Sequence, residues 1–332
     1  MNPLSEIVSR FTGKRIVVIG DTIADQFIYG EISRVSREAP VFILLHEHTE
    51  TTPGGAGNCA ANLASLGAEV ILLAVVGDDS SGKALVDKLH ASGVNCDKVM
   101  TSPGRRTTTK VRVLAGQTHS TRQQVIRIDY DSSPPVDGDE RERLMQRIPA
   151  EIKTADAVII SDYNCGLVDV PLTAQAWYAA DQRGIPILVD SRFRLADFPR
   201  FTSATPNEDE VEKLHGKPVK DDRELEVVGA RLREQLDFRS LLITRGNRGM
   251  VLFEAGAAPL HIEAVGPQEP VDVTGAGDTV IATYTLAIAA GASFADAARL
   301  ANFAGGIVVM KRGTATVSAK ELLSSITTST SE

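Results

Sequence analysis

The sequence has few cysteines, no surplus of basic residues and no apolar stretch long enough to cross a bilayer. Its three cysteines, Cys59, Cys96 and Cys165, are odd in number and form no Cys-x-x-Cys pair, which argues against a disulfide framework or a zinc site and favours a cytoplasmic location. The net charge of −8 argues against a nucleic-acid partner. The longest apolar runs, around 279–290 and 303–310, are too short to span a membrane, so no membrane partner is expected.

The remaining composition is that of an ordinary globular protein, with 43% apolar and 23% charged residues. No internal repeat or low-complexity linker divides the chain, and α/β proteins of this length often form one core with an appendage. We therefore expect a single domain spanning 1–332. Because the chain is acidic, it can bind phosphates only by gathering cations locally and by using backbone N–H groups.

Short β-branched runs alternate with amphipathic or Ala-rich segments along most of the chain. Strands are predicted at 15–20, 69–76, 156–161, 185–190, 240–244 and 249–253, and helices at 56–66, 80–92, 171–183, 275–290 and 294–309. This alternation predicts an α/β fold with a doubly wound, mostly parallel sheet.

Two segments, 22–50 and 105–130, interrupt this alternation. Both have strand-like patterning without a predicted helix, so neither can be a crossover unit of the parallel sheet. We expect them to form one small β-sheet lid from two insertions.

The strongest chemical signal is the segment Asp272-Val-Thr-Gly-Ala-Gly-Asp278, which precedes an apolar helix. Gly275, Ala276 and Gly277 have little or no side chain, so their N–H groups can approach an anion at the helix N-terminus. A carboxylate beside that anion site suits a base that takes a proton from a hydroxyl attacking a phosphate. Taken alone, the segment also fits a Gly-rich helix start with Asp278 as an ordinary first-turn acid.

A second Gly-rich segment, Pro53-Gly-Gly-Ala-Gly-Asn58, opens another predicted helix. Gly54 and Gly55 permit close approach of a ligand, and Asn58 can donate to and accept from hydroxyl groups. The spacing is not that of a dinucleotide fingerprint, and no strand is predicted directly before it. A tight turn with a helix cap is the competing interpretation.

Two acidic residues follow the first strand, at the edge where ligands bind in open α/β sheets. Asp21 and Asp25 could accept hydrogen bonds from sugar hydroxyls, although Asp21 fits a turn-forming role equally well. The segment Gly77–Ala84 nearly matches a P-loop. It has Ala84 where a hydroxyl is needed to bind magnesium, so we expect a structural turn there.

Together these segments resemble the ribokinase-like, or PfkB, family of carbohydrate kinases over roughly residues 14–322. The two signature regions fall at Gly54–Gly67 and Asp272–Asp278, in the family's order and separation. The resemblance implies a ribokinase-like α/β domain with a lid over the sugar, ATP and Mg²⁺ as ligands, and a homodimer formed through the lid. It also implies that Asp278 is the catalytic base and that residues 275–277 form an anion hole.

The same resemblance assigns further residues to ATP and to ions. Asn207 and Glu210 would organise Mg²⁺ and the phosphates through water, although alone they fit solvated helix-start residues. The resemblance also implies a nucleotide-binding turn with Thr244 and Gly246 near the phosphates. It implies that Asn302 lies beside the adenine and that a K⁺-like ion binds near Asp272 and Thr274.

Within the family, the chain is most similar to the heptose-7-phosphate kinases. The similar stretches are Arg34–Pro40, Thr109–Val113, Ile126–Asp129, Ser161–Tyr163 and Asp272–Thr279. By this resemblance Asp162 belongs to the acceptor site. Four cations of the presumed lid would bind a phosphate already present on the sugar: Arg34, Lys110, Arg112 and Arg127. A solvated strand face is the alternative for these four residues.

Two stretches depart from the heptose-kinase pattern. Asn164-Cys-Gly replaces the expected Ala-Lys-Gly, and Asp190-Ser-Arg192 replaces Asp-Pro-Lys. Loss of a lysine beside the sugar pocket leaves a different sugar phosphate or an unphosphorylated sugar open as acceptor. The nearest alternatives are kinases of the same fold that act on a fructose-like sugar or on a nucleoside. A non-catalytic sugar-binding protein of the same fold is the third alternative. The retention of Asp278 with Asn207 and Glu210 argues against it.

Overall fold

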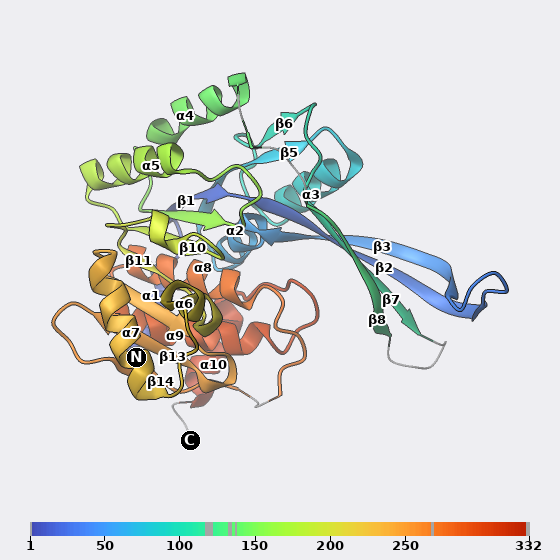
Figure 1. Ribbon diagram of the computed structural model, residues 1–332. Helices are drawn as coiled ribbons and strands as arrows, with labels where there is room; N and C mark the ends of the chain where they lie inside the picture. Colours follow the sequence, from blue (N-terminus) through green and yellow to red (C-terminus); the bar gives the residue numbers. More distant parts are fainter. Residues whose placement is uncertain (1, 117–121, 132–134, 137, 267–268, 330–332) are drawn as a thin grey trace.

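Helices cover both faces of a central sheet in the computed structural model, and a second sheet projects from one side (Figure 1). The structure describes residues 2–116, 122–131, 135–136, 138–266 and 269–329. Its helices are α1 (Pro3–Ser9), α2 (Ala56–Ser65), α3 (Ser80–Ala91), α4 (Gly138–Ile152), α5 (Val170–Arg183), α6 (Glu208–His215), α7 (Asp222–Gln235), α8 (Ala276–Ala289), α9 (Phe294–Val308) and α10 (Ala319–Ser329). Within these described residues, no helix has the length and apolar character needed to cross a membrane.

The central sheet is parallel throughout and has the order β11-β10-β9-β1-β4. Its strands are β1 (Arg15–Gly20), β4 (Glu69–Leu73), β9 (Ala157–Asp162), β10 (Ile187–Ser191) and β11 (Ser203–Ala204). Successive side chains of a strand point to opposite faces. Ile16 and Val18 therefore join the core that contains α2, α8 and α9, while Val17 and Ile19 join the core that contains α4, α5 and α7. This confirms the predicted doubly wound sheet.

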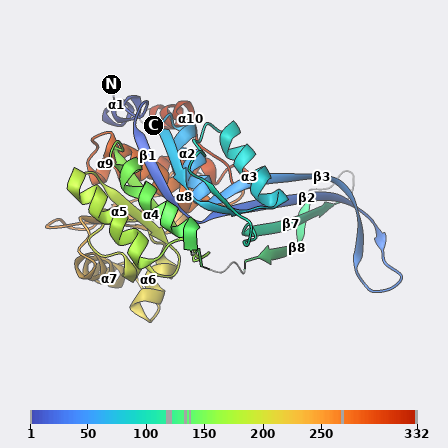
Figure 2. The ribbon, with the colours of Figure 1, turned by 90° about the horizontal axis from the view of Figure 1, so that it is seen from above.

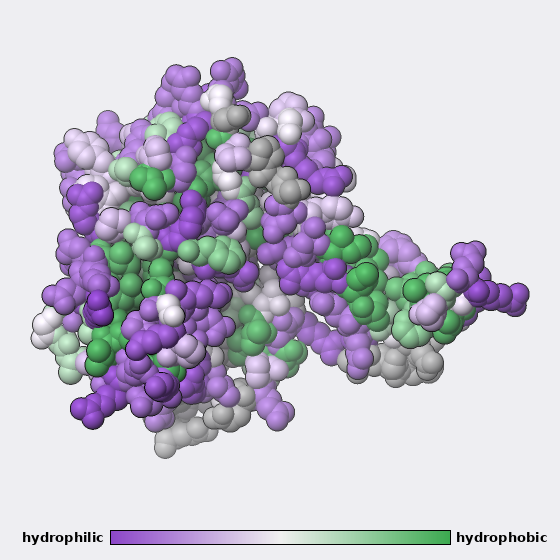
Figure 3. All heavy atoms as spheres, in the orientation of Figure 1, coloured by the Kyte–Doolittle hydropathy of each residue, from purple (hydrophilic) through white to green (hydrophobic). Residues whose placement is uncertain are grey.

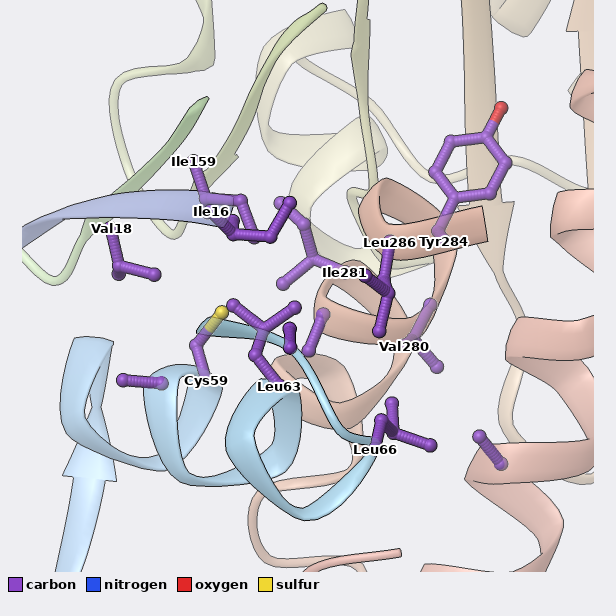
Figure 4. Packing of buried hydrophobic residues seen from close by; sticks show 14 of the residues in the cluster. Ile16, Val18, Cys59, Leu63, Leu66, Ile159, Val280, Ile281, Tyr284 and Leu286 are labelled. Carbon is purple, nitrogen blue, oxygen red and sulfur yellow. The ribbon is translucent and has the colours of Figure 1, made fainter. Parts of the chain in front are cut away.

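The core below β1 fixes the two Gly-rich helix starts relative to each other. Leu63 of α2 and Val280 and Ile281 of α8 are buried in the same cluster as Ile16 of β1 (Figure 4). Because interiors are close-packed, helices held in this way cannot slide past one another without opening voids. The N-terminal ends of α2 and α8 are thus held in a fixed mutual position.

Two further sheets complete the body. The antiparallel sheet has the order β12-β13-β14, from β12 (Ser240–Thr244), β13 (Met250–Glu254) and β14 (Leu260–Ile262). The predicted strand 69–76 is interrupted at Ala74, so that β4 pairs with β1 while β5 (Val75–Gly77) pairs with β6 (Met100–Ser102). The segment resembling a P-loop is a structural turn, because the Asp79 carboxylate caps α3 by accepting from Gly82 N.

The two interrupting segments form one four-stranded sheet, which we call the lid sheet, with the order β3-β2-β7-β8 (Figure 2). Its strands are β2 (Thr22–Val35), β3 (Phe42–Gly55), β7 (Thr109–Gly116) and β8 (Gln123–Tyr130). The sheet predicted from 22–50 and 105–130 is therefore present, although 117–121 lie outside the described residues. The expectation that no strand directly precedes α2 is wrong, because β3 continues through Pro53 and Gly54 to Gly55 by pairing with the start of β2.

Gly20, at the carboxyl end of β1, supplies a test of this packing. A Cβ added there would lie 2.1 Å from the carbonyl oxygen of Ser161 on β9, whereas a Cβ added to Gly104 would meet nothing within 4 Å. We expect Gly20→Ala to lower the free energy of unfolding by about 1–3 kcal/mol because backbone cannot yield easily. Urea denaturation should show this loss, with Gly104→Ala as the matched control. Equal midpoints for the two variants would contradict the packing described here.

Candidate active site

Asp278 lies in the first turn of α8, and its side chain is buried. Asn58 Nδ2 donates to one carboxylate oxygen at 2.9 Å, and the Tyr163 hydroxyl donates to the other at 2.7 Å. Burial raises the pKa of Asp278 to about 6, while the hydrogen bonds from Asn58 and Tyr163 oppose that rise. A carboxyl group with such a pKa is ionised at neutral pH and can still accept a proton.

The predicted anion hole, residues 275–277, forms the N-terminal end of α8. Gly275 is the N-cap residue with φ of 79°, and a Cβ there would lie 2.4 Å from Asn58 Nδ2. A Cβ added to Gly277 would instead meet open space, because Ala276 and Gly277 border a cavity. The positive end of the helix dipole therefore faces a space that an anion can enter.

The second Gly-rich segment holds the acidic residues near β1 in place. A Cβ on Gly54 would lie 2.3 Å from Asp25 Oδ2, and one on Gly55 would lie 2.6 Å from the carbonyl oxygen of Asp21. Asn58 Nδ2 also approaches the carbonyl oxygen of Gly275 at 3.3 Å. The segment thus brings the starts of α2 and α8 together with Asp25.

The carboxylates of Asp21 and Asp162 accept hydrogen bonds from other groups of the protein. The Asp21 carboxylate accepts from the backbone N–H groups of Tyr163, Cys165 and Leu167 at 2.9–3.2 Å. The Asp162 carboxylate accepts from Ser191 Oγ and Arg194 Nη2, each at 2.7 Å. Both acids therefore shape the loop after β9, which agrees with the turn-forming alternative for Asp21.

The four predicted lid cations are in different environments. Arg112 forms an ion pair with Asp25. Arg127 forms one with Asp129 at 2.7 Å. Arg34 is exposed near the far end of the β2–β3 hairpin (Figure 2). Lys110 lies over Tyr163, with Nζ 5.8 Å from the centroid of the ring.

The predicted metal-organising residues begin α6. Asn207 and Glu210 form a capping box, in which the side chain of each accepts from the other's backbone N–H at 2.9 Å. Burial raises the pKa of Glu210 although these hydrogen bonds oppose it. A bridge pairs Asn207 with Thr244 at the end of β12. Magnesium prefers carboxylate and water oxygens, so this donor set fits Mg²⁺ bound through water.

The predicted nucleotide residues line one cavity of about 180 Å³. Thr244 ends β12, and Gly246 lies in the turn that leads to β13. Asn302 comes from α9, where its Nδ2 donates to the carbonyl oxygen of Glu263 at 2.7 Å. The apolar side chains of Val265 and Val280 complete much of the wall. The cavity reaches Ala276 and Gly277, so its largely apolar space is continuous with the predicted anion hole.

A larger cleft of about 1050 Å³ separates the lid sheet from the body. Its walls include Arg112 from β7 and the loop that contains Asp272 and Thr274. The Asp272 carboxylate accepts from Thr274 N and Gly313 N, each at 2.9 Å. Asp272 therefore joins the two loops beside this cleft, and a monovalent ion at Asp272 and Thr274 remains a prediction.

Sequence reasoning named three residues near Asp278 only within compared stretches and gave them no role at the site: Tyr163, Asp190 and Arg192. The Arg192 guanidinium lies 4.9 Å from the centroid of the Tyr163 ring. Burial raises the pKa of Asp190 well above its usual value, and the charges of Glu210 and Asp278 add to the rise. Their positions at the carboxyl ends of β9 and β10 could have identified them, because ligands bind at that edge of a parallel sheet.

Comparisons with known proteins identify the relatives of this chain. Residues 14–321 match the model of the pfkB family carbohydrate kinases. The bifunctional protein HldE of Caulobacter vibrioides is 40% identical over 323 residues, 96% of this chain and 65% of that protein. HldE of Nitrosococcus oceani is 42% identical over 316 residues, which are 94% of this chain and 64% of that protein. The chain thus spans slightly less than two thirds of these relatives.

Solved structures share the fold at low sequence identity. The ribokinase of Arabidopsis thaliana, complexed with ribose and ATP, has a TM-score of 0.74 and 21% identity and covers 95% of this chain and 99% of its own. Phosphofructokinase-2 of Escherichia coli, in complex with potassium, has a TM-score of 0.77 and 18% identity, with coverage of 96% and 99%. From the family match and these relatives we conclude that the chain belongs to the pfkB family of carbohydrate kinases.

Proposed function

We propose that the chain transfers the γ-phosphoryl group of ATP to a sugar-phosphate hydroxyl, with heptose 7-phosphate as acceptor and its anomeric hydroxyl as the site. One observation carries the kinase proposal. The buried base Asp278 lies in the same helix turn as the amides that border the nucleotide cavity. A base and an anion site this close together suit a hydroxyl attacking a phosphate.

In this mechanism Asp278 accepts the proton of the acceptor hydroxyl as that oxygen attacks phosphorus. The N–H groups at 275–277 offset charge that develops on the phosphoryl oxygens. Asn58 and Tyr163 hold the carboxylate in position from two sides. When bound through Asn207 and Glu210, Mg²⁺ would supply further charge neutralisation.

The choice of acceptor rests on the match to the HldE proteins and on the stretches that resemble heptose-7-phosphate kinases. One observation favours a second candidate, a kinase whose acceptor carries no phosphate. Arg112 and Arg127 already form ion pairs with Asp25 and Asp129, so fewer lid cations are available for a distal phosphate.

The lid sheet also supports a proposed homodimer. Large apolar side chains are exposed on its strands, and Figure 3 shows hydrophobic residues gathered on this projecting part. Examples are Phe42, Leu45 and Ile126, which are 57%, 59% and 53% exposed. Exposed apolar patches mark interaction surfaces, and two lids could cover one another. The chain would then act as one kinase domain over 1–332, with the lid sheet over the acceptor.

Asp278→Asn tests the base directly. We expect kcat to fall by about 10²–10⁴-fold because an amide cannot take the proton. ATP affinity should remain close to that of the unmodified protein. ADP release with Mg-ATP measures turnover, and Asp296→Asn, in the first turn of α9, is the matched control. Near-normal turnover in Asp278→Asn would refute the assigned role.

A panel of free sugars and sugar phosphates tests the acceptor. Turnover on heptose 7-phosphate, but not on the unphosphorylated sugars, is the expected result. Turnover only on free sugars would retain the kinase and replace the acceptor. If no sugar or sugar phosphate released ADP, the non-catalytic alternative would gain support.

The pH dependence provides a further test. Because the base must be ionised, kcat/KM for the acceptor should fall about tenfold per pH unit below a pKa of about 6. Tyr163→Phe removes a hydrogen bond that lowers the pKa of Asp278, so the acidic limb should move to higher pH. A pH–rate profile of both proteins measures the shift, and identical limbs would contradict this role of Tyr163.

A further inference from the structure

Arg192 is a cation of the site with no assigned role. It directly follows β10, and its exposed guanidinium lies 4.9 Å from the centroid of the Tyr163 ring, whose hydroxyl donates to Asp278. Arg192 forms no ion pair with any residue that the structure describes. Its neighbour Arg194 differs, because Nη2 of Arg194 donates to Asp162 and to the carbonyl oxygen of Val168.

The positive charge of Arg192 affects the pKa of three carboxyl groups. Burial raises the pKa of Asp278, Asp190 and Glu210, and the positive charge of Arg192 opposes the rise in each case. Asp278 is the proposed base, and Glu210 lies on the proposed magnesium side. Arg192 is therefore near enough to interact electrostatically with the proposed base and with the proposed magnesium side of the site.

The position of Arg192 suits hydrogen bonding to a ligand more than pairing with another residue of the protein. A guanidinium presents a planar fork of N–H donors that matches phosphate oxygens, and stacking on an aromatic ring restrains its plane. An arginine kept only for stability would gain more from pairing with one of the neighbouring carboxylates. Arg192 instead remains available above Tyr163.

We propose that Arg192 is a catalytic residue that donates hydrogen bonds to the phosphoryl group during its transfer. The inference rests on the proposed kinase function. The acceptor oxygen forms a bond to the γ-phosphorus while the bond to the bridging oxygen breaks, and that electron pair leaves with ADP. The acceptor proton goes to Asp278, and Arg192 stays protonated while it offsets charge on the equatorial oxygens.

Two variants separate charge from geometry. Arg192→Gln removes both the charge and the fork, and we expect kcat to fall by about 100-fold or more, as for loss of one transition-state donor. Arg192→Lys keeps the charge, so its kcat should fall less than that of Arg192→Gln. Added guanidinium chloride should restore part of the turnover of an Arg192→Ala protein, which a purely structural role would not allow.

The matched control is Arg239→Gln. Arg239 also stacks on an aromatic ring, with its guanidinium carbon 5.6 Å from the centroid of Phe294. Phe294 begins α9, just after the C-terminal end of α8, and the 14 residues of α8 place its two ends about 20 Å apart. This variant should keep the turnover of the unmodified protein.

Binding measurements test the inference independently of turnover. Calorimetric titration of Mg-ADP with and without aluminium fluoride, a mimic of the phosphoryl group in transfer, should show that Arg192→Gln weakens only the fluoride complex. Equal weakening of both complexes, or unchanged binding of both, would overturn the inference. If the unmodified protein phosphorylates no acceptor, the proposed function fails, whereas the fluoride titration still decides whether Arg192 binds a transferring phosphoryl group.

Discussion

The proposed chemistry depends on one buried carboxylate that can accept a proton. Burial of Asp278 favours its neutral form, and the hydrogen bonds from Asn58 and Tyr163 favour the charged form. Asn58 comes from α2 and Tyr163 from the loop after β9, so the balance holds only if three elements keep their relative positions. The close packing of α2 and α8 below β1 supplies that constraint.

Two buried acids that take no part in the proposed proton transfer also hold these elements in position. Asp21 fixes the loop that carries Tyr163 by accepting three of its backbone N–H groups. Asp162 joins the end of β9 to the end of β10 through Ser191 and to the loop that follows it through Arg194. Replacing such acids would leave buried donors unsatisfied, so their role is to position the loops beside Asp278.

An acidic chain that handles phosphates has to control which of its cations stay free. Arg112 and Arg127 are neutralised by Asp25 and Asp129 on the lid sheet. Lys110 and Arg192 lie over the ring of Tyr163. Among the described residues neither of these two cations forms an ion pair, and the hydroxyl of that tyrosine donates to Asp278 at the start of α8, where backbone amides add partial positive charge.

The sequence by itself determined the elements and the family, because buried β-branched runs and Gly-rich helix starts are local patterns. β1, α2 and α8 and the segment 272–278 were predictable for this reason. Other features could not be predicted from local patterns: the sheet registers, the continuation of β3 into α2 and the surroundings of each charge. Asp21, Arg112 and Arg127 were expected to bind ligands, yet each has a partner within the protein. Tyr163, just after β9, donates to Asp278, and Arg192, just after β10, lies over the Tyr163 ring. Only the tertiary structure could decide this, because pairing depends on distances between segments far apart in the chain.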